Sequence, residues 1–222
     1  MGGLIPLGDA SRRPRTSAAV VVALIVVNAW VFFEELQHGN SFVRMWSAIP
    51  FRITHGHYAV TLITSMFLHA SWMHILGNMV FLWAFGPAIE DVMGHFGFLC
   101  FYLLGGVGAM LAQVLGDANS HIPCLGASGA IAAVMGVFIV TFPKDRIRTL
   151  LFILIFIRIT YIPAVLLIGF WFLTQVFDFG VVAEARTGGV AYLAHIAGFL
   201  FGVVLGRLFV DGKRLAFRRL YG

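Results

Sequence analysis

Charged side chains are scarce in this sequence. Asp, Glu, Lys and Arg together make up 11% of its 222 residues, while hydrophobic residues make up 60% and the mean hydropathy is +0.92. A soluble domain carries about 25% charged residues. The shortage excludes a soluble globular fold and indicates an integral membrane protein, with the lipid bilayer as its first partner.

Cysteine is also rare, and the usual ligands of metal sites are not grouped. Cys100 and Cys124 do not form a disulfide framework, since one lies in an apolar run and the other in a loop. The zinc-protease pattern H-E-x-x-H is absent. His69, His74 and Asn78 have no cysteine or carboxylate beside them, which makes them a poor zinc site. We therefore expect neither a metal nor a cofactor.

The basic residues do not form a nucleic-acid surface. The formal net charge is +5, but the lysines and arginines gather next to apolar runs, in the segments 12–15, 144–148 and 213–219. Such clusters are typical of the cytoplasmic flanks of membrane spans. We expect no nucleic-acid partner, because the chain offers no folded basic surface.

Six apolar runs are long enough to cross a bilayer as helices. Backbone polar groups in lipid must be satisfied within the segment, so the sequence predicts an all-α membrane protein. The predicted spans are residues 17–36, 73–91, 95–115, 127–142, 161–178 and 189–209. They form one six-helix bundle over residues 17–210, between an N-terminal tail at 1–16 and a basic C-terminal tail at 211–222.

An even number of spans puts both termini on the same side of the membrane. If that side is the cytoplasm, every lysine and arginine lies there except Arg44, Arg52 and Arg186. This asymmetry agrees with the positive-inside rule. No serine-rich transit segment is recognisable, so the expected location is a bacterial inner membrane.

Two further apolar stretches are expected to lie in the membrane interface. Residues 37–72 form a long outer loop between the first two spans, and its aromatic side chains are typical of interfacial segments. Residues 149–160 are apolar as well, but a seventh span there would break the charge asymmetry. We place them as an interfacial segment before Pro163.

Two polar residues stand among small residues at membrane depth. Ser128 lies at the outer end of one span, and His195 lies near the outer end of another, beside Gly198 and Gly202. Small residues let membrane helices approach closely, so we expect Ser128 and His195 to meet as a nucleophile and its base. Either residue alone could be helix-packing glue, but their matched depth and matched small faces favour catalysis.

The second span carries hydrogen-bond donors for such a site. His74 and Asn78 are four residues apart and share a helical face, with His69 just upstream. With the backbone N–H of Ser128 at a helix N-terminus, they could stabilise the oxyanion that a serine nucleophile creates. The alternative is that they bond to neighbouring helices. No carboxylate is aimed at His195, so we expect a two-residue mechanism.

These motifs, in this order, resemble the rhomboid family of intramembrane serine proteases. The resemblance covers residues 60–210 and rests on four stretches, 67–78, 85–90, 126–131 and 194–202. It implies that Ser128 is the nucleophile and His195 the general base. It also implies an oxyanion hole of His74, Asn78 and the Ser128 N–H, with His69 as an accessory residue.

The resemblance implies a rhomboid-like bundle that hydrolyses peptide bonds in or near transmembrane segments of single-span or other membrane proteins. The family commonly has an aromatic residue four positions after the serine, where this chain has Ala132. Tyr192 or Phe138 could support His195 instead. A rhomboid-like pseudoprotease that binds transmembrane clients without cleavage is the alternative. A small transporter is disfavoured, because charged residues facing a pore and inverted repeats are not evident.

Overall fold

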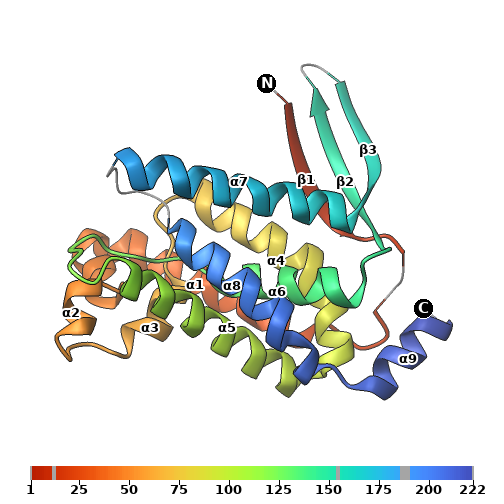
Figure 1. Cartoon of the computed structure of the whole chain (residues 1–222), viewed down its shortest axis with the longest axis horizontal. Coiled ribbons are helices and arrows are strands. Elements are labelled where there is room, and N and C mark those ends of the chain that lie inside the picture. The colour runs from red at the N-terminus through yellow and green to blue at the C-terminus, as the bar shows by residue number, and fades with distance from the viewer. Residues whose placement is uncertain (1, 12–13, 154–155, 186–190, 222) are drawn as a thin grey trace.

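The protein is a mostly helical bundle with a small β-sheet at one end (Figure 1). The computed structural model describes residues 2–11, 14–153, 156–185 and 191–221. In chain order its elements are β1 (Gly2–Asp9), α1 (Ala19–Trp46), α2 (Pro50–Thr54), α3 (Thr61–Thr64), η1 (Ser65–Phe67), α4 (Trp72–Met93), α5 (His95–Gly116), α6 (Ser128–Thr141), β2 (Arg146–Ile153), β3 (Phe156–Pro163), α7 (Ala164–Ala185), α8 (Tyr192–Leu205), η2 (Gly206–Phe209) and α9 (Gly212–Tyr221).

Each predicted span overlaps one α-helix, in the order α1, α4, α5, α6, α7 and α8. The fifth span begins too early in the prediction, because residues 161–163 belong to β3. In the described part of the chain, four segments are long and apolar enough to cross a membrane, namely α1, α4, α5 and Tyr192–Phe209. Ser128–Thr141 and Ala164–Gly180 are shorter apolar helices. The chain is therefore an integral membrane protein. The first residues of the predicted sixth span, 189–190, and Arg186 lie outside the described residues.

Helix α6 forms the centre of the bundle and packs against α4, α5 and α8. Glycine makes its contact with α8 unusually close. A Cβ atom on Gly198 would lie 2.2 Å from the carbonyl oxygen of Gly129, and one on Gly202 would lie 2.0 Å from that of Ala133. The two backbones therefore touch directly, which is how small residues drive helix association in lipid.

An acidic pair at the end of α4 fastens both chain termini to the bundle. Glu90 accepts hydrogen bonds from the N–H groups of Val20 and Val21, both at 2.9 Å, and so satisfies the start of α1. Asp91 accepts from the N–H and the hydroxyl of Thr16 at 3.0 and 2.9 Å.

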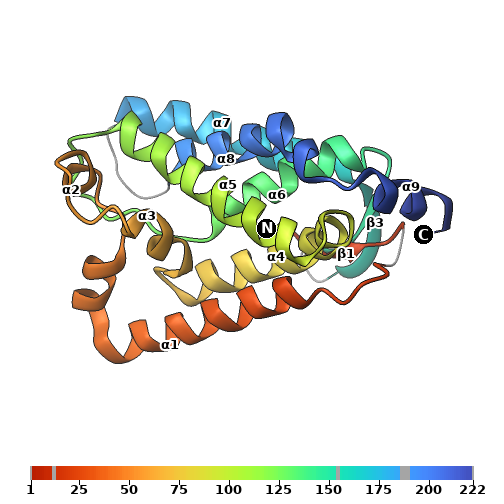
Figure 2. The same ribbon diagram turned by 90° about the horizontal axis from the view of Figure 1, so that it is seen from below.

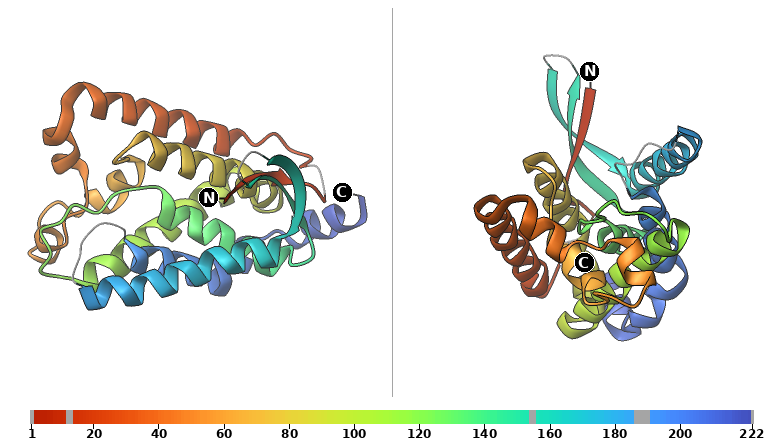
Figure 3. Two further views of the ribbon diagram at one scale, coloured as in Figure 1. Left: turned by 90° about the horizontal axis from the view of Figure 1, so that it is seen from above. Right: turned by 90° about the vertical axis from the view of Figure 1, so that its left-hand side faces the viewer.

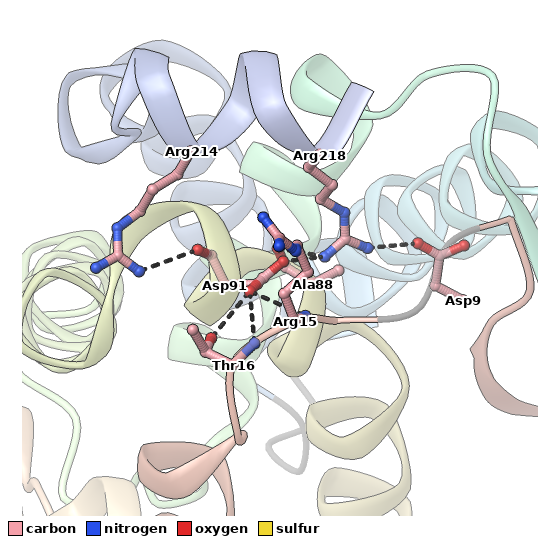
Figure 4. Close-up of polar contacts among 7 residues, drawn as sticks. All are labelled: Asp9, Arg15, Thr16, Ala88, Asp91, Arg214 and Arg218. Carbon is pink, nitrogen blue, oxygen red and sulfur yellow. Dashed lines mark hydrogen bonds and ion pairs between the residues drawn. The ribbon is translucent and has the colours of Figure 1, made fainter. Parts of the chain in front are cut away.

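Arg218 of α9 completes this network (Figure 4). Its guanidinium donates to Asp91 at 3.1 Å and to Asp9 of β1 at 3.0 Å, and its side chain is only 1% exposed. As a result the sheet and α9 lie at the same end of the bundle (Figure 3).

The sheet corrects one of the sequence predictions. The fold is not all-α: the described residues of the 149–160 segment belong to β2 and β3, which pair antiparallel with Ile147 opposite Ile162, and β1 pairs with the other edge of β2. The interfacial position of this segment stays a prediction. The run is rich in isoleucine and phenylalanine, which favour strands. A short apolar run is compatible with either a strand or a helix. The sequence also does not indicate that the N-terminal segment pairs with this run.

The segment between the first two spans is also more ordered than a loop. Helix α1 continues to Trp46 and bends at Gly39, whose φ of 65° lies in the left-handed region (Figure 2). The short elements α2, α3 and η1 follow. Ala48 then pairs with Cys124, which ties this segment to the loop before α6.

The contact between α6 and α8 predicts a sharp response to added bulk. Replacing Gly202 by Ala forces the two backbones apart, and overpacking of this kind costs about 1–3 kcal/mol. We expect Gly202→Ala to lower the free energy of unfolding in detergent by this amount. The control is Gly169→Ala on α7, where no atom lies within 4 Å of the new Cβ. Equal stability of the two variants would contradict the close contact.

Candidate active site

Ser128 and His195 form a hydrogen-bonded pair between α6 and α8. Ser128 is the first residue of α6, and its Oγ lies 2.7 Å from Nε2 of His195. The imidazole is buried, with 9% of the residue exposed. This is the separation at which an imidazole can take the proton of an attacking hydroxyl.

The close contact between the helices holds this pair in register. Gly129 follows the serine directly, and Gly198 lies three residues after the histidine, and these are the residues whose backbones touch. On the other side of α8, the side-chain carbonyl of Gln113 on α5 accepts the N–H of Ala194 at 3.2 Å. The first turn of α8 is thus fixed from two sides.

A residue that the sequence analysis did not single out lies behind the imidazole. Oε1 of Gln175, on α7, is 2.6 Å from Nδ1 of His195. The signal available in the sequence was a glutamine inside an apolar span, because a polar side chain at membrane depth needs a partner. A carboxylate was the expected kind of partner for the imidazole, and Gln175 carries a neutral amide instead.

Aromatic rings around His195 come from α7 and α8 instead of α6. Ala132 is fully buried and supplies no ring. The ring centroid of Trp171 lies 5.9 Å from that of His195, and the ring of Tyr192 stands edge-on at 6.3 Å. Phe138 packs against Phe85 and Phe142. Of the two aromatic residues suggested by the sequence, Tyr192 is therefore the one found beside the histidine.

His74 approaches the serine from α4. Ser71 caps this helix by accepting the N–H of His74 at 3.2 Å. The N–H of Ala70 donates to Nδ1 of His74 at 3.3 Å, so the neutral ring carries its proton on Nε2. A Cβ on Gly126 would lie 2.9 Å from that Nε2 and 3.5 Å from Oγ of Ser128. His74 thus presents an N–H donor next to the serine.

Asn78 lies one turn further along α4 and is buried, with 8% of the residue exposed. Its Nδ2 has no hydrogen-bond partner within the part of the chain that the structure describes. Burying an amide N–H without a hydrogen-bond partner costs free energy, so the unpaired group requires an explanation. One explanation is that Nδ2 is kept free to donate to an oxygen of a reacting substrate.

His69 stands behind His74 and does not bond to the serine. Its N–H donates to the carboxylate of Glu35 on α1 at 3.0 and 3.2 Å, and its ring meets that of His74 edge-on at 5.1 Å. Burial, and then the neighbouring His74, lower the pKa of His69 to about 3. The ring is therefore neutral at pH 7, and its visible contact is the packing of His74.

Cys124, in the loop before α6, is not a second nucleophile. Burial, and then Asp117, raise the pKa of Cys124 to about 11, so this thiol is not a nucleophile at neutral pH. Among the described residues, no three His, Cys, Asp or Glu side chains gather as metal ligands.

A narrow cleft adjoins Ser128, with about 270 Å³ of empty space, part of it open to solvent. Small residues dominate its wall, which includes Gly106, Ala109, Gly129, Ala191 and Ala194. Such a wall leaves room for a small side chain beside the serine.

Comparison with known proteins identifies the relatives of this chain. The Rhomboid domain model matches residues 56–212. Rhomboid-like protein 11, chloroplastic, of Arabidopsis thaliana is 26% identical over 206 residues, covering 88% of this chain and 67% of that protein. Rhomboid protein 1, mitochondrial, of Saccharomyces cerevisiae is 30% identical over 153 residues, covering 66% of this chain and 41% of that protein.

The human presenilin-associated rhomboid-like protein, mitochondrial, is 28% identical over 150 residues, covering 64% of this chain and 36% of that protein. The matched regions therefore span between 36% and 67% of the length of these three relatives.

Gly126 offers a test of the site geometry. Its φ of +123° disfavours any side chain, and a Cβ there would press against His74 and Ser128. We expect Gly126→Ala to slow the reaction of Ser128 with a fluorophosphonate probe by about tenfold or more, an effect of about 1.4 kcal/mol per decade. The control is Gly77→Ala on α4, where the added methyl meets nothing within 4 Å. Equal labelling of both variants would contradict the described packing.

Proposed function

Because this chain belongs to the rhomboid family, we propose that it is an intramembrane serine protease that hydrolyses peptide bonds in or near the transmembrane segments of other membrane proteins. The observation that carries the proposal is the 2.7 Å contact between Oγ of Ser128 and Nε2 of His195. A half-buried serine and a buried histidine at this distance on two helices of the bundle are arranged as a nucleophile and its base.

The proposed reaction begins when His195 accepts the proton of Ser128 while Oγ attacks the scissile carbonyl carbon. The resulting imidazolium then donates this proton to the leaving amine, and the peptide C–N bond breaks to leave an acyl-serine. In the second half, His195 takes a proton from water as the water oxygen attacks the ester carbonyl. The imidazolium then returns this proton to Oγ of Ser128 while the ester C–O bond breaks, which frees the new carboxyl group and the serine. The imidazole ends each half-reaction neutral, so the cycle is balanced.

The proposed oxyanion hole uses donors from two elements. The Nε2–H of His74 and the unpaired Nδ2 of Asn78 come from α4, and the N–H of Ser128 comes from the start of α6. The first N–H groups of a helix lack intrahelical partners. Donors fixed before the reaction stabilise the negative charge that develops on the carbonyl oxygen. His69 contributes by packing against His74.

The proposed substrates are single-span or other transmembrane proteins. Glycine and alanine make up most of the cleft wall beside Ser128, together with Met66, Met110 and Leu125, which favours small side chains next to the cut bond. A helical substrate keeps its carbonyl groups hydrogen-bonded, so it must unwind locally before attack.

We also propose that α6 and α7 complete a six-span bundle with the four longer segments. The ordered segment from α2 to η1 then lies at the outer membrane interface, and both termini lie in the cytoplasm. A bacterial inner membrane stays a prediction, because the names of the relatives above refer to chloroplasts and mitochondria.

The first test compares the wild type with Ser128→Ala and His195→Ala on a fluorescent single-span substrate in liposomes. We expect cleavage and fluorophosphonate labelling by the wild type, and neither by the two variants. Ser47→Ala removes a buried serine away from the pair and serves as the control. Undiminished cleavage by Ser128→Ala would show a wrong nucleophile. A folded wild type that neither cleaves nor labels would favour a pseudoprotease that only binds transmembrane clients.

The oxyanion assignment predicts a loss confined to the chemical step. Asn78→Ala should lower kcat by about 10²–10³-fold with little change in KM, since the donor acts only when charge develops. Asn28→Ala on α1 is the matched control, because Asn28 is also buried but donates to Leu24 within its own helix. A normal kcat for Asn78→Ala would remove Asn78 from the oxyanion hole.

A further inference from the structure

We propose that Gln175 is a positioning residue, which holds His195 in the one neutral tautomer that can take a proton from Ser128. The inference rests on the proposed function, because it assigns Gln175 a role only through His195 as the base. Its starting point is the 2.6 Å contact between Oε1 of Gln175 and Nδ1 of His195.

The amide of Gln175 has a defined orientation. Its Nε2 lies 3.1 Å from Oγ1 of Thr174 and 3.4 Å from the carbonyl oxygen of Trp171, and it donates to both. The carbonyl oxygen of a backbone accepts only, so the nitrogen must face that way. The side-chain oxygen is therefore the atom turned toward the imidazole.

This orientation decides where the imidazole proton sits. An amide oxygen accepts and cannot donate, so Nδ1 of His195 must carry the hydrogen. The lone pair then lies on Nε2, 2.7 Å from the hydroxyl of Ser128. In the opposite tautomer, Nδ1 and Oε1 would be two acceptors facing each other and Nε2 could not accept the serine proton. The amide thus excludes the unproductive form.

The same bond persists through the reaction. Once Nε2 has taken the serine proton, the imidazolium donates from both ring nitrogens. Oε1 of Gln175 still accepts from Nδ1, so no group has to rotate. A neutral amide does this without placing a second charge at membrane depth, where a carboxylate would be costly.

The support comes from a single face of α7. Trp171 and Gln175 are four residues apart, one turn of helix, and both meet His195. Other side chains of this helix are strongly exposed, such as Phe170 at 64% and Phe177 at 71%. The orientation of the base therefore depends on how α7 is seated against α8.

A second glutamine serves as a control that distinguishes positioning of the His195 ring from general support of α8. Gln113 on α5 also bonds to the first turn of α8, but its oxygen accepts the backbone N–H of Ala194 and does not touch the ring. Replacing each glutamine by methionine keeps the side-chain length and removes the acceptor. Gln175→Met should change the tautomer of His195, whereas Gln113→Met should leave it unchanged.

The experiment records ¹⁵N spectra of histidine-labelled full-length protein in detergent micelles at a pH where the ring is neutral. His195→Ala identifies the signals of His195. We expect the wild type and Gln113→Met to show the proton on Nδ1, and Gln175→Met to shift the equilibrium toward Nε2–H. Gln175→Glu retains an oxygen at the same position and, at a pH where the new carboxyl group is ionised and can only accept, should restore the wild-type tautomer.

Cleavage kinetics supply the second readout. Gln175→Met should lower kcat about 10- to 100-fold with KM unchanged, a smaller loss than the ~10²–10⁴-fold that a general base contributes. Gln175→Glu should recover most of this loss. A wild-type His195 with its proton on Nε2, or a Gln175→Met variant with the wild-type tautomer and kcat, would overturn the proposal.

Failure of the proposed function would look different. A wild type that cleaves nothing but keeps the Nδ1 proton through Gln175 would refute the protease and leave the positioning bond standing, because the spectra need no substrate.

Discussion

The direct contact between the backbones of α6 and α8 is the constraint on which the rest of the site depends. Gly198 and Gly202 bring the two helices so close that a Cβ atom at either position would lie 2.2 or 2.0 Å from a carbonyl oxygen of α6. At this separation the first residue of α6 and the first turn of α8 face each other, and Ser128 and His195 come within hydrogen-bond distance. The site is therefore a consequence of packing between small residues, which is the principal means of helix association in lipid.

Polar groups in this protein are divided between two ends with different tasks. At the sheet end, the carboxylates of Glu90 and Asp91 accept hydrogen bonds from backbone N–H groups and from Arg218. These bonds hold α1, α4 and α9 together. One turn along α4 from His74, by contrast, Asn78 keeps an unpaired donor at some cost in stability. Other buried side-chain atoms of the described residues also lack a partner, among them both ring nitrogens of His69, so it is the position of Asn78 on the same helical face as His74 that indicates a ligand oxygen.

The helices and the meeting of Ser128 with His195 could be predicted because both rest on local patterns, namely apolar length and small residues at helical spacing. The hairpin could not, because β2 is stabilised by pairing with Leu4 and its neighbours, far away in the sequence. The contact of Gln175 with His195 could not be predicted for a related reason, because α7 approaches His195 through the packing of the bundle. Because Ala132 supplies no aromatic ring beside His195, a ring from another position was expected. Trp171 provides one from α7.

The bridge from Arg218 to Asp9 and Asp91 has a consequence for the order of assembly. During synthesis the two aspartates leave the ribosome long before the arginine, which follows the last of the long helices. Among the described residues that precede α9, the hydrogen bonds to the Asp91 side chain come from Thr16 and the N–H of Arg15. The Arg218 bridge between Asp9 of β1 and Asp91 of α4 therefore forms after the bonds between Asp91 and Thr16, once α9 has been synthesised.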